Sequence, residues 1–201
     1  MGRRTQDTKK KDTKNGDRAE LLCAISWVFA SSNDRIVKSS VEDDIKKHID
    51  WYVHMANGRI ITYDCKARRF EEYGKGFSPD YYFIAEIMNR QGILGSIYGE
   101  QLFMAHEISG YFNFILRKYI VEEVENDVKK YGMKVSNIDS SYRNLYTSPK
   151  YDDGHVLTAF PFTEFQIKKL PIPQEFLERQ FLYTPEELKR YIIENKLNIN
   201  F

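Results

Sequence analysis

Residues 48–67 read HIDWYVHMANGRIITYDCKA and carry the clearest structural pattern in the chain. Apolar and polar residues alternate on both sides of Asn57-Gly58. Strict alternation around an Asn-Gly pair is typical of an antiparallel β-hairpin, because successive side chains of a strand point to opposite faces. We therefore expect two paired strands whose chain reverses at residues 56–58.

The length of the turn sets which residues face each other across the hairpin. A two-residue turn would place the polar side chains of one strand beside the apolar side chains of the other. A three-residue loop with Gly58 in the left-handed conformation pairs Met55 with Arg59. It then places Asp50 opposite Asp64 and separates the two kinds of side chain. We predict this second register, whose apolar face holds Ile49, Trp51, Val53, Met55, Ile61, Tyr63 and Cys65.

The polar face of this hairpin gathers residues with catalytic chemistry. Asp64 and Lys66 point the same way from one strand, and Asp50 lies across from Asp64. Two carboxylates this close repel each other unless a cation lies between them, and carboxylates with room for water are usual ligands of Mg²⁺ or Mn²⁺. A lysine beside that ion can assist an attacking water and offset charge on a phosphate. We expect a site for phosphodiester hydrolysis, with a solvated cross-strand salt bridge as the alternative.

Residues next to this set are candidates for contacts to a nucleic acid. Arg68 and Arg69 follow the lysine directly, and His48 falls opposite Lys66 in the predicted register. Each would contact phosphate groups without reading the base sequence. The alternative for each is an ordinary solvated side chain.

A helix is expected before the hairpin. Asp17-Arg18-Ala19-Glu20 has the form of a capping box, and apolar residues follow at helical spacing to about residue 29. Capping and the helix dipole account for Glu20 by themselves. The alternative is that Glu20 is a third acid at the metal site.

The order of these features resembles the PD-(D/E)XK nuclease superfamily. A helix with a glutamate is followed by Ile-Asp at 49–50, a hairpin and Asp-Cys-Lys at 64–66, over roughly residues 17–116. The family order is helix, strand, strand with the aspartate, strand with (D/E)-x-K, helix and strand. The segment 89–107 is also similar to small phage-encoded members. The absence of proline before the aspartate, and of an evident helix motif after the lysine, leaves the branch of the superfamily open.

The resemblance implies residue roles and a fold. Asp50 and Asp64 would hold Mg²⁺ or Mn²⁺, with Glu20 as the helix-borne acid. Lys66 would be the catalytic lysine. The expected fold is α/β (α+β), with a central mixed sheet of about five strands flanked by helices in a restriction-endonuclease-like arrangement.

The rest of the chain predicts further elements and a single domain at residues 17–201. Residues 1–16 carry six basic and two acidic side chains without apolar periodicity, and we expect a disordered basic arm there. The mostly polar stretch from about residue 133 predicts a C-terminal extension that packs on the core. Strands are expected near 35–40, 81–88, 102–108, 111–116 and 155–160, helices at 118–131 and 184–195, and a polar loop at 41–47.

Composition limits the classes of protein to consider. The chain has 201 residues, of which 42% are hydrophobic, and its 13 Phe and 14 Tyr suffice for a core. A formal charge of +1 means that affinity for nucleic acid must come from a local patch. Two cysteines form neither a disulfide framework nor a four-cysteine zinc site. No signal peptide or membrane-spanning segment is evident, so we expect a cytoplasmic protein, in the host cytoplasm if it is phage-encoded.

We expect from these residues a Mg²⁺- or Mn²⁺-dependent hydrolase of DNA, with recombination or branched-DNA processing as the setting that the resemblance implies. A non-catalytic module that binds nucleic acid or protein on the same fold is the alternative, favoured if Glu20 turns away from the site. The sequence does not separate DNA from RNA, or endonuclease from exonuclease. It also leaves open whether the chain forms a homodimer or needs a partner for activity.

Overall fold

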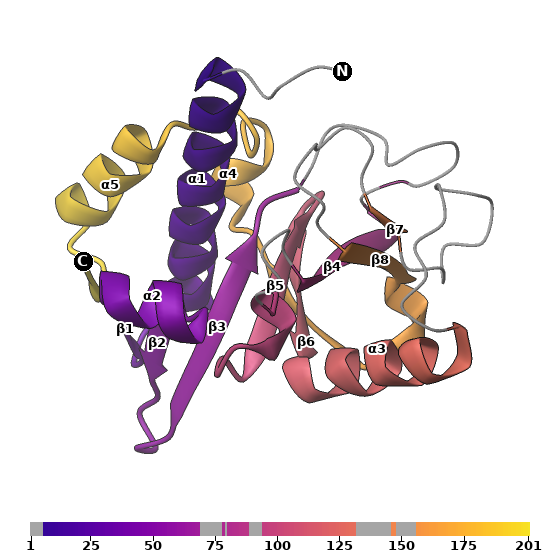
Figure 1. Cartoon of the computed structure of the whole chain (residues 1–201). Helices are drawn as coiled ribbons and strands as arrows, with labels where there is room; N and C mark the ends of the chain where they lie inside the picture. The colour runs from indigo at the N-terminus through magenta and orange to yellow at the C-terminus, as the bar shows by residue number, and fades with distance from the viewer. Residues whose placement is uncertain (1–5, 69–77, 79, 89–93, 132–145, 148–155) are drawn as a thin grey trace.

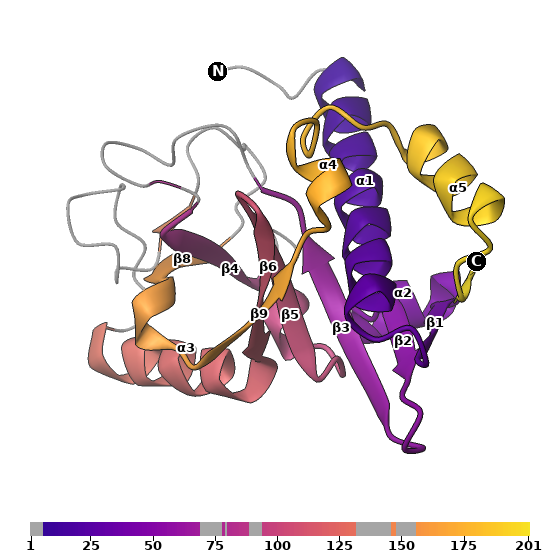
Figure 2. The same cartoon turned by 180° about the vertical axis from the view of Figure 1, so that it is seen from behind.

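Two β-sheets and their flanking helices make up the described part of the chain (Figures 1 and 2). The structure, a computed structural model, describes residues 6–68, 78, 80–88, 94–131, 146–147 and 156–201. Its helices are α1 (Gln6–Ala30), α2 (Val41–Lys47), α3 (Arg117–Tyr131), α4 (Gln174–Leu177) and α5 (Pro185–Glu194), with short 3₁₀ turns η1 (Ser96–Tyr98) and η2 (Phe162–Glu164). Its strands are β1 (Arg35–Lys38), β2 (Trp51–His54), β3 (Ile60–Lys66), β4 (Tyr82–Met88), β5 (Phe103–Ile108), β6 (Tyr111–Leu116), β7 (Tyr146–Thr147), β8 (Val156–Pro161), β9 (Ile167–Pro171) and β10 (Ile199–Asn200).

The larger sheet is mixed and, within the described residues, contains seven strands in the order β10-β1-β2-β3-β5-β6-β9. Strands β1, β2 and β3 form an antiparallel meander, and β5 then lies parallel to β3. Strands β4, β8 and β7 form the smaller, antiparallel sheet. The expected α/β class, with a mixed central sheet flanked by helices, is confirmed.

The C-terminal region supplies both edges of the central sheet as described here. Strand β9 pairs antiparallel with β6, and β10 pairs parallel with β1. The expected number of strands was too low, because these two strands are short and have no clear alternation of their own. Pairing with a neighbouring strand, more than local sequence, forms them. The region predicted to pack on the core as an extension therefore completes the sheet itself.

The β2–β3 hairpin has the predicted register. Trp51 pairs with Tyr63. At the turn, the Met55 N–H donates to the Arg59 carbonyl at 2.9 Å, and Gly58 has a left-handed φ of 82°. Trp51, Val53, Ile61, Tyr63 and Cys65 of the predicted apolar face lie in one buried cluster, with the partly buried Met55 packed against it. Ile49 is buried but precedes β2 and is not part of that cluster.

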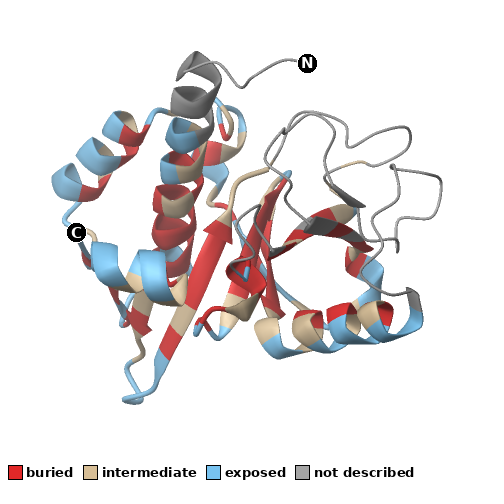
Figure 3. Ribbon diagram, in the orientation of Figure 1, coloured by how far each residue is buried: buried red, intermediate tan, exposed pale blue. Residues whose placement is uncertain are grey.

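Each face of the central sheet packs against different elements. Helix α1 covers the apolar face of the hairpin, and α2 lies on the opposite side of strands β1–β3 (Figures 1 and 2). Helix α3 and the smaller sheet pack on the β5–β6 part of that opposite side. Buried residues run through α1, β3 and β5, whereas α2 is mostly exposed (Figure 3). The α1 side includes Leu22, Ile25, Trp27, Trp51 and Tyr63, and the opposite side includes Phe83, Met104, Ile108, Ile120 and Phe160.

Several other elements follow the sequence expectations. Strands β4, β5, β6 and β8 and helix α3 lie where alternation or helical spacing predicted them. Helix α5 begins with the predicted capping box, in which the Glu187 N–H donates to Thr184 Oγ1 at 3.2 Å. None of the helices in the described ranges has the length and apolar character needed to cross a membrane.

Helix α1 begins earlier than predicted. It starts at Gln6, so Asp17 lies inside the helix, and residues 6–16 are helical where a disordered arm was expected. The Asp-x-x-Glu pattern is also an ordinary spacing within a helix, and no proline precedes it to stop the helix. The Asn15 amide donates to the Arg68 carbonyl at 3.3 Å, which ties this part of α1 to the chain that leaves β3.

The expected polar loop at residues 41–47 is helix α2. Ser40 caps it by accepting from the Asp43 N–H at 3.1 Å. Acidic residues occupy its first turn and lysines its last turn, which suits the helix dipole. These signals are visible in the sequence, but α2 buries no residue, so hydrophobic periodicity does not indicate it.

A buried ion pair joins α1 to the central sheet. Arg18 donates to the two carboxylate oxygens of Glu107 at 2.6 and 2.5 Å, and both side chains are at most 2% exposed. The Gln180 amide donates to the same carboxylate at 3.1 Å, and the Arg68 N–H donates to it at 3.0 Å. Loss of one charged partner would leave the other buried without compensation, so this pair constrains how α1 sits on the sheet.

Glu107→Ala should lower the free energy of unfolding by about 3–5 kcal/mol, because Arg18 would stay buried without its carboxylate. Urea unfolding at neutral pH measures the change. Glu42→Ala is the control, since it removes an exposed glutamate that pairs with Lys46 at 2.7 Å. That change should cost less than about 1 kcal/mol. Equal losses in the two variants would contradict the structural role of the buried pair.

Candidate active site

Asp50 and Asp64 lie next to each other at the end of the hairpin that is remote from its turn. Asp50 directly precedes β2, and Asp64 is in β3. The Asp50 N–H donates to the Tyr63 carbonyl at 3.0 Å, and the Asp50 carboxylate accepts from the Cys65 N–H at 2.6 Å. Asp50 is 5% exposed and Asp64 is 3% exposed. The predicted register thus brings two carboxylates together, and the fold buries both.

Lys66 completes the cluster from the same strand as Asp64. Its Nζ donates to Oδ1 of Asp64 at 2.7 Å. The Lys66 side chain is 39% exposed, so it lies at the border between the buried acids and the surface. The second carboxylate oxygen of Asp64, Oδ2, is buried and has no hydrogen-bond partner among the described residues.

Burial opposes ionisation of both acids, and the charge of Asp64 adds to this effect at Asp50. Burial, followed by the charge of Asp64, raises the pKa of Asp50 to about 7. Burial also raises the pKa of Asp64, although Lys66 and a hydrogen bond with Asp50 act in the opposite direction. Burial disfavours the charge on Lys66, but Asp64 and Asp50 outweigh it and raise the pKa of the lysine above its usual value. At neutral pH the cluster therefore favours one more positive charge, either a proton or a cation.

Glu20 lies near the two aspartates but is bound to a lysine. Its carboxylate accepts from Nζ of Lys38 in β1. Burial and then the charge of Asp50 raise the pKa of Glu20 to about 7. Lys38 is a neighbour of the site that sequence reasoning missed. The signal that could have indicated Lys38 is a charged residue on the apolar face of the sheet. It pairs with Trp51, and its Nζ lies 5.1 Å from the centre of the Trp51 ring.

The residues expected to contact nucleic acid lie in different settings. His48 is the C-cap of α2 with a left-handed φ of 54°, so the prediction that it sits in the strand opposite Lys66 was wrong. Burial and then the charge of Lys66 lower the pKa of His48. Arg68 donates to both carboxylate oxygens of Asp80 at 2.9 Å. Arg69 lies outside the described residues.

The loop after η1 holds the end of α2 next to the site. The Glu100 N–H donates to the Lys47 carbonyl at 2.7 Å. A Cβ atom at Gly99 would lie 2.5 Å from that carbonyl oxygen and 2.7 Å from Cβ of His48. Because Gly99 has no Cβ, this loop can pack closely against the end of α2. The contact fixes the position of the chain just before Asp50.

Strand β5 adds a residue that the sequence pattern did not indicate. His106 pairs with Lys66 across the parallel β3–β5 ladder and so lies on the same face of the sheet. Burial, followed by the charge of Lys66, lowers the pKa of His106 to about 3. Its imidazole is therefore neutral at neutral pH. No local pattern predicts this pairing, because parallel pairing joins segments that are far apart in the sequence.

Asp50 and Asp64 suit a hard divalent cation that keeps part of its water. Mg²⁺ is commonly held by one or two carboxylates, and the unpartnered Oδ2 of Asp64 is an available oxygen donor. Within the described ranges, no group of three or more His, Cys, Asp or Glu side chains is arranged to hold a metal ion. The available ligands are therefore the two aspartate carboxylates and water. Glu20 is not among them while its carboxylate is bound to Lys38.

The candidate site rests on this geometry. Comparison of the chain with models of protein families, with curated proteins and with solved structures gave no match. The resemblance to PD-(D/E)XK nucleases therefore stays a prediction from the sequence.

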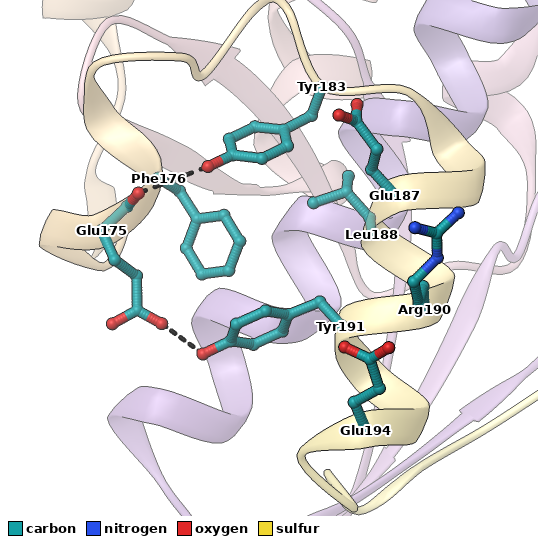
Figure 4. A pocket seen from close by; sticks show the side chains of 8 residues that line it. All are labelled: Glu175, Phe176, Tyr183, Glu187, Leu188, Arg190, Tyr191 and Glu194. Carbon is teal, nitrogen blue, oxygen red and sulfur yellow. Dashed lines mark hydrogen bonds between the residues drawn. The ribbon is translucent and has the colours of Figure 1, made fainter.

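A pocket of about 350 Å³ lies between α4 and α5 (Figure 4). Phe176 lies between the rings of Tyr183 and Tyr191, with 4.9 Å between the ring centres of Phe176 and Tyr191. Both tyrosine hydroxyls donate to Glu175, that of Tyr183 to the backbone carbonyl at 3.4 Å. None of the residues predicted for the active site lines this pocket, so it has no part in the chemistry of the two aspartates.

Asp50→Asn should stabilise the metal-free protein at pH 8 and change it little at about pH 4. The pKa of Asp50 is raised to about 7 in the folded state, so the folded protein keeps a proton that the unfolded chain releases above about pH 4. The stability from this group therefore falls as the pH rises from about 4 to 7. Asparagine removes that loss and can still accept from the Cys65 N–H. We expect a gain of roughly 2 kcal/mol at pH 8, measured by urea unfolding in EDTA.

Asp34→Asn is the control with the opposite sign. Burial acts to raise the pKa of Asp34, but hydrogen bonds from Trp27 Nε1 and the Ala56 N–H outweigh it and lower the pKa. Stability from this carboxylate is present above its usual pKa and is lost as the pH falls, so asparagine should destabilise the protein at pH 8. A loss of stability in Asp50→Asn at pH 8 would contradict the acid pair described above.

Proposed function

We propose that this chain is a divalent-metal-dependent nuclease that hydrolyses phosphodiester bonds of DNA. The observation that carries the proposal is the buried pair of Asp50 and Asp64 beside the partly exposed Lys66, whose ammonium bonds to Asp64. Burying two carboxylates together costs stability that neutral side chains at these positions would not cost. A cation between the carboxylates offsets that cost.

The reaction needs an attacking water, compensation of charge on the phosphate and an oxygen that can leave. A Mg²⁺ or Mn²⁺ ion held by Asp50 and Asp64 would supply Lewis-acid catalysis. The Lys66 ammonium, whose raised pKa keeps it protonated, would offset charge that develops on the phosphate. The water oxygen forms the new bond to phosphorus and gives up a proton to the solvent, the phosphorus–oxygen bond of the backbone breaks, and the leaving oxygen takes up a proton from the solvent.

The order of the elements supports the proposal. Helix α1 with Glu20, the β1–β2–β3 meander with both aspartates at one end, and the parallel strand β5 follow the family order that the resemblance implies. One difference is the segment between β3 and β5, where the described residues contain strand β4 and the turn η1 in place of a helix. A further difference is helix α2 between β1 and β2. The fold class therefore fits the resemblance, the order of elements fits it in part, and the branch of the superfamily stays open.

A non-catalytic module that binds nucleic acid or protein is the second candidate. The observation that favours it is the ion pair between Glu20 and Lys38. While Lys38 holds the Glu20 carboxylate, that acid cannot join the two aspartates as a metal ligand. In this case the aspartates and Lys66 would form a structural ion-pair cluster. The two candidates differ in whether the chain cleaves anything when metal is present.

A cleavage panel tests the proposal. Linear, single-stranded, circular and four-way-junction DNA, together with RNA, are incubated with the full chain in Mg²⁺, Mn²⁺ or EDTA. We expect the wild type to cleave DNA in either metal and not in EDTA. Asp64→Asn should abolish cleavage by removing a charged metal ligand, and Lys66→Met should lower the rate by roughly 10²–10³-fold.

Lys46→Met is the matched control, because Lys46 is an exposed lysine on α2 that pairs with an acid four residues away. It should cleave like the wild type. Thermal unfolding establishes that each variant is folded. Absence of cleavage by the wild type in both metals, with equal nucleic-acid binding by wild type, Asp64→Asn and Lys66→Met, would establish the binding module instead.

A further inference from the structure

His106 lies beside the proposed catalytic lysine and has no role in the chemistry described so far. In the parallel β3–β5 ladder it pairs with Lys66, while Met104 pairs with Asp64. Paired residues of neighbouring strands lie on the same face, so the imidazole is the side chain next to the lysine across the sheet. This placement makes it a candidate for direct contact with the ammonium.

The imidazole is buried and packed between aromatic rings. His106 is 5% exposed, and its ring centre lies 4.6 Å from that of Phe83 and 5.8 Å from that of Phe162. These rings come from β4 and η2, which cover this part of the sheet. The aromatic packing therefore holds the imidazole in one place beside β3.

One nitrogen of this imidazole needs a partner. Nε2 of His106 is buried and has no hydrogen-bond partner within the described part of the chain. A buried polar atom without a partner destabilises the fold, and a phenylalanine in the same aromatic cluster would avoid that cost. Burial and the charge of Lys66 keep the imidazole neutral, so one of its nitrogens is a hydrogen-bond acceptor.

Lys66 has donors for more than one acceptor. Its ammonium carries three N–H groups, and Oδ1 of Asp64 accepts from it at 2.7 Å. If Asp64 takes a cation, its carboxylate becomes a weaker acceptor for the lysine, because the cation competes for the same negative charge. A second fixed acceptor would then keep the ammonium in position.

We propose that His106 is a positioning residue for Lys66, whose ammonium donates to the neutral Nε2 of His106 when Asp64 binds a cation. The catalytic consequence rests on the proposed nuclease function, whereas the hydrogen bond itself does not. Asp64 holds the lysine from its own strand, and His106 holds it from β5. The ammonium thereby keeps its place on the polar face of the sheet.

Nitrogen NMR of the full chain, labelled at histidine, tests the bond without reference to activity. We expect Nε2 of His106 to be unprotonated in the wild type. Asp64→Asn removes the charged partner of the lysine, so the Nε2 resonance should shift in that variant. The shift should vanish in the double variant with Lys66→Met. A protonated Nε2, or the same Nε2 resonance in the wild type and Asp64→Asn, would overturn the proposal.

Cleavage kinetics test the consequence for catalysis. His106→Phe keeps an aromatic ring in the cluster and removes the acceptor, so kcat should fall roughly 10- to 100-fold with KM unchanged. His106→Gln offers an acceptor at similar reach and should restore most of the loss. His54→Phe, at the turn end of β2, is the matched control and should leave kcat unchanged.

The two experiments separate failure of this inference from failure of the proposed function. If the wild type cleaves nothing, the nuclease proposal fails, and the NMR result still decides whether the hydrogen bond forms. If the wild type cleaves and folded His106→Phe has the same kcat, the positioning role is wrong and the nuclease proposal stands.

Discussion

The three-residue turn at Gly58 constrains most of what lies around it. It sets the pairing of β2 with β3, and with it the face on which every side chain of the hairpin lies. A slip by one residue would put Trp51 and Tyr63 on opposite faces of the sheet, so only one of them could pack against α1. The same pairing puts Asp50 beside Asp64. The main core and the candidate site are thus two consequences of one register.

The candidate site is the part of the fold where burial and charge conflict. Three acids, Glu20, Asp50 and Asp64, lie close enough to disfavour one another's ionisation, and the lysines Lys38 and Lys66 offset only part of their charge. Such a cluster stabilises a protein poorly by itself. Local conflicts of this kind are expected where a protein gives up stability for function. A divalent cation on the polar face would resolve the conflict and explain why the acids are buried together.

Residues far away in the sequence hold the strands that carry this site. Strand β9 and strand β10 border the central sheet on its two sides in the described residues. Gln180 donates to the Glu107 carboxylate in β5 and accepts from the Gly110 N–H at 2.9 Å, so it links the C-terminal region to the β5–β6 turn. Arg18 reaches the same carboxylate from α1. The geometry of β3 and β5 therefore depends on both ends of the chain.

Short-range patterns in the sequence were sufficient for the hairpin, its register and the meeting of Asp50 with Asp64, because alternation and a glycine turn act over few residues. Other features needed the whole fold. The pairing of Lys66 with His106 requires a parallel ladder between distant segments. Strands β9 and β10 form only by pairing with β6 and β1, which lie far before them in the sequence. The protonation state of the acids also depends on the tertiary structure. On an isolated hairpin the same aspartates would be hydrated and ionised, whereas α1 and the surrounding strands exclude the water that would stabilise their charge.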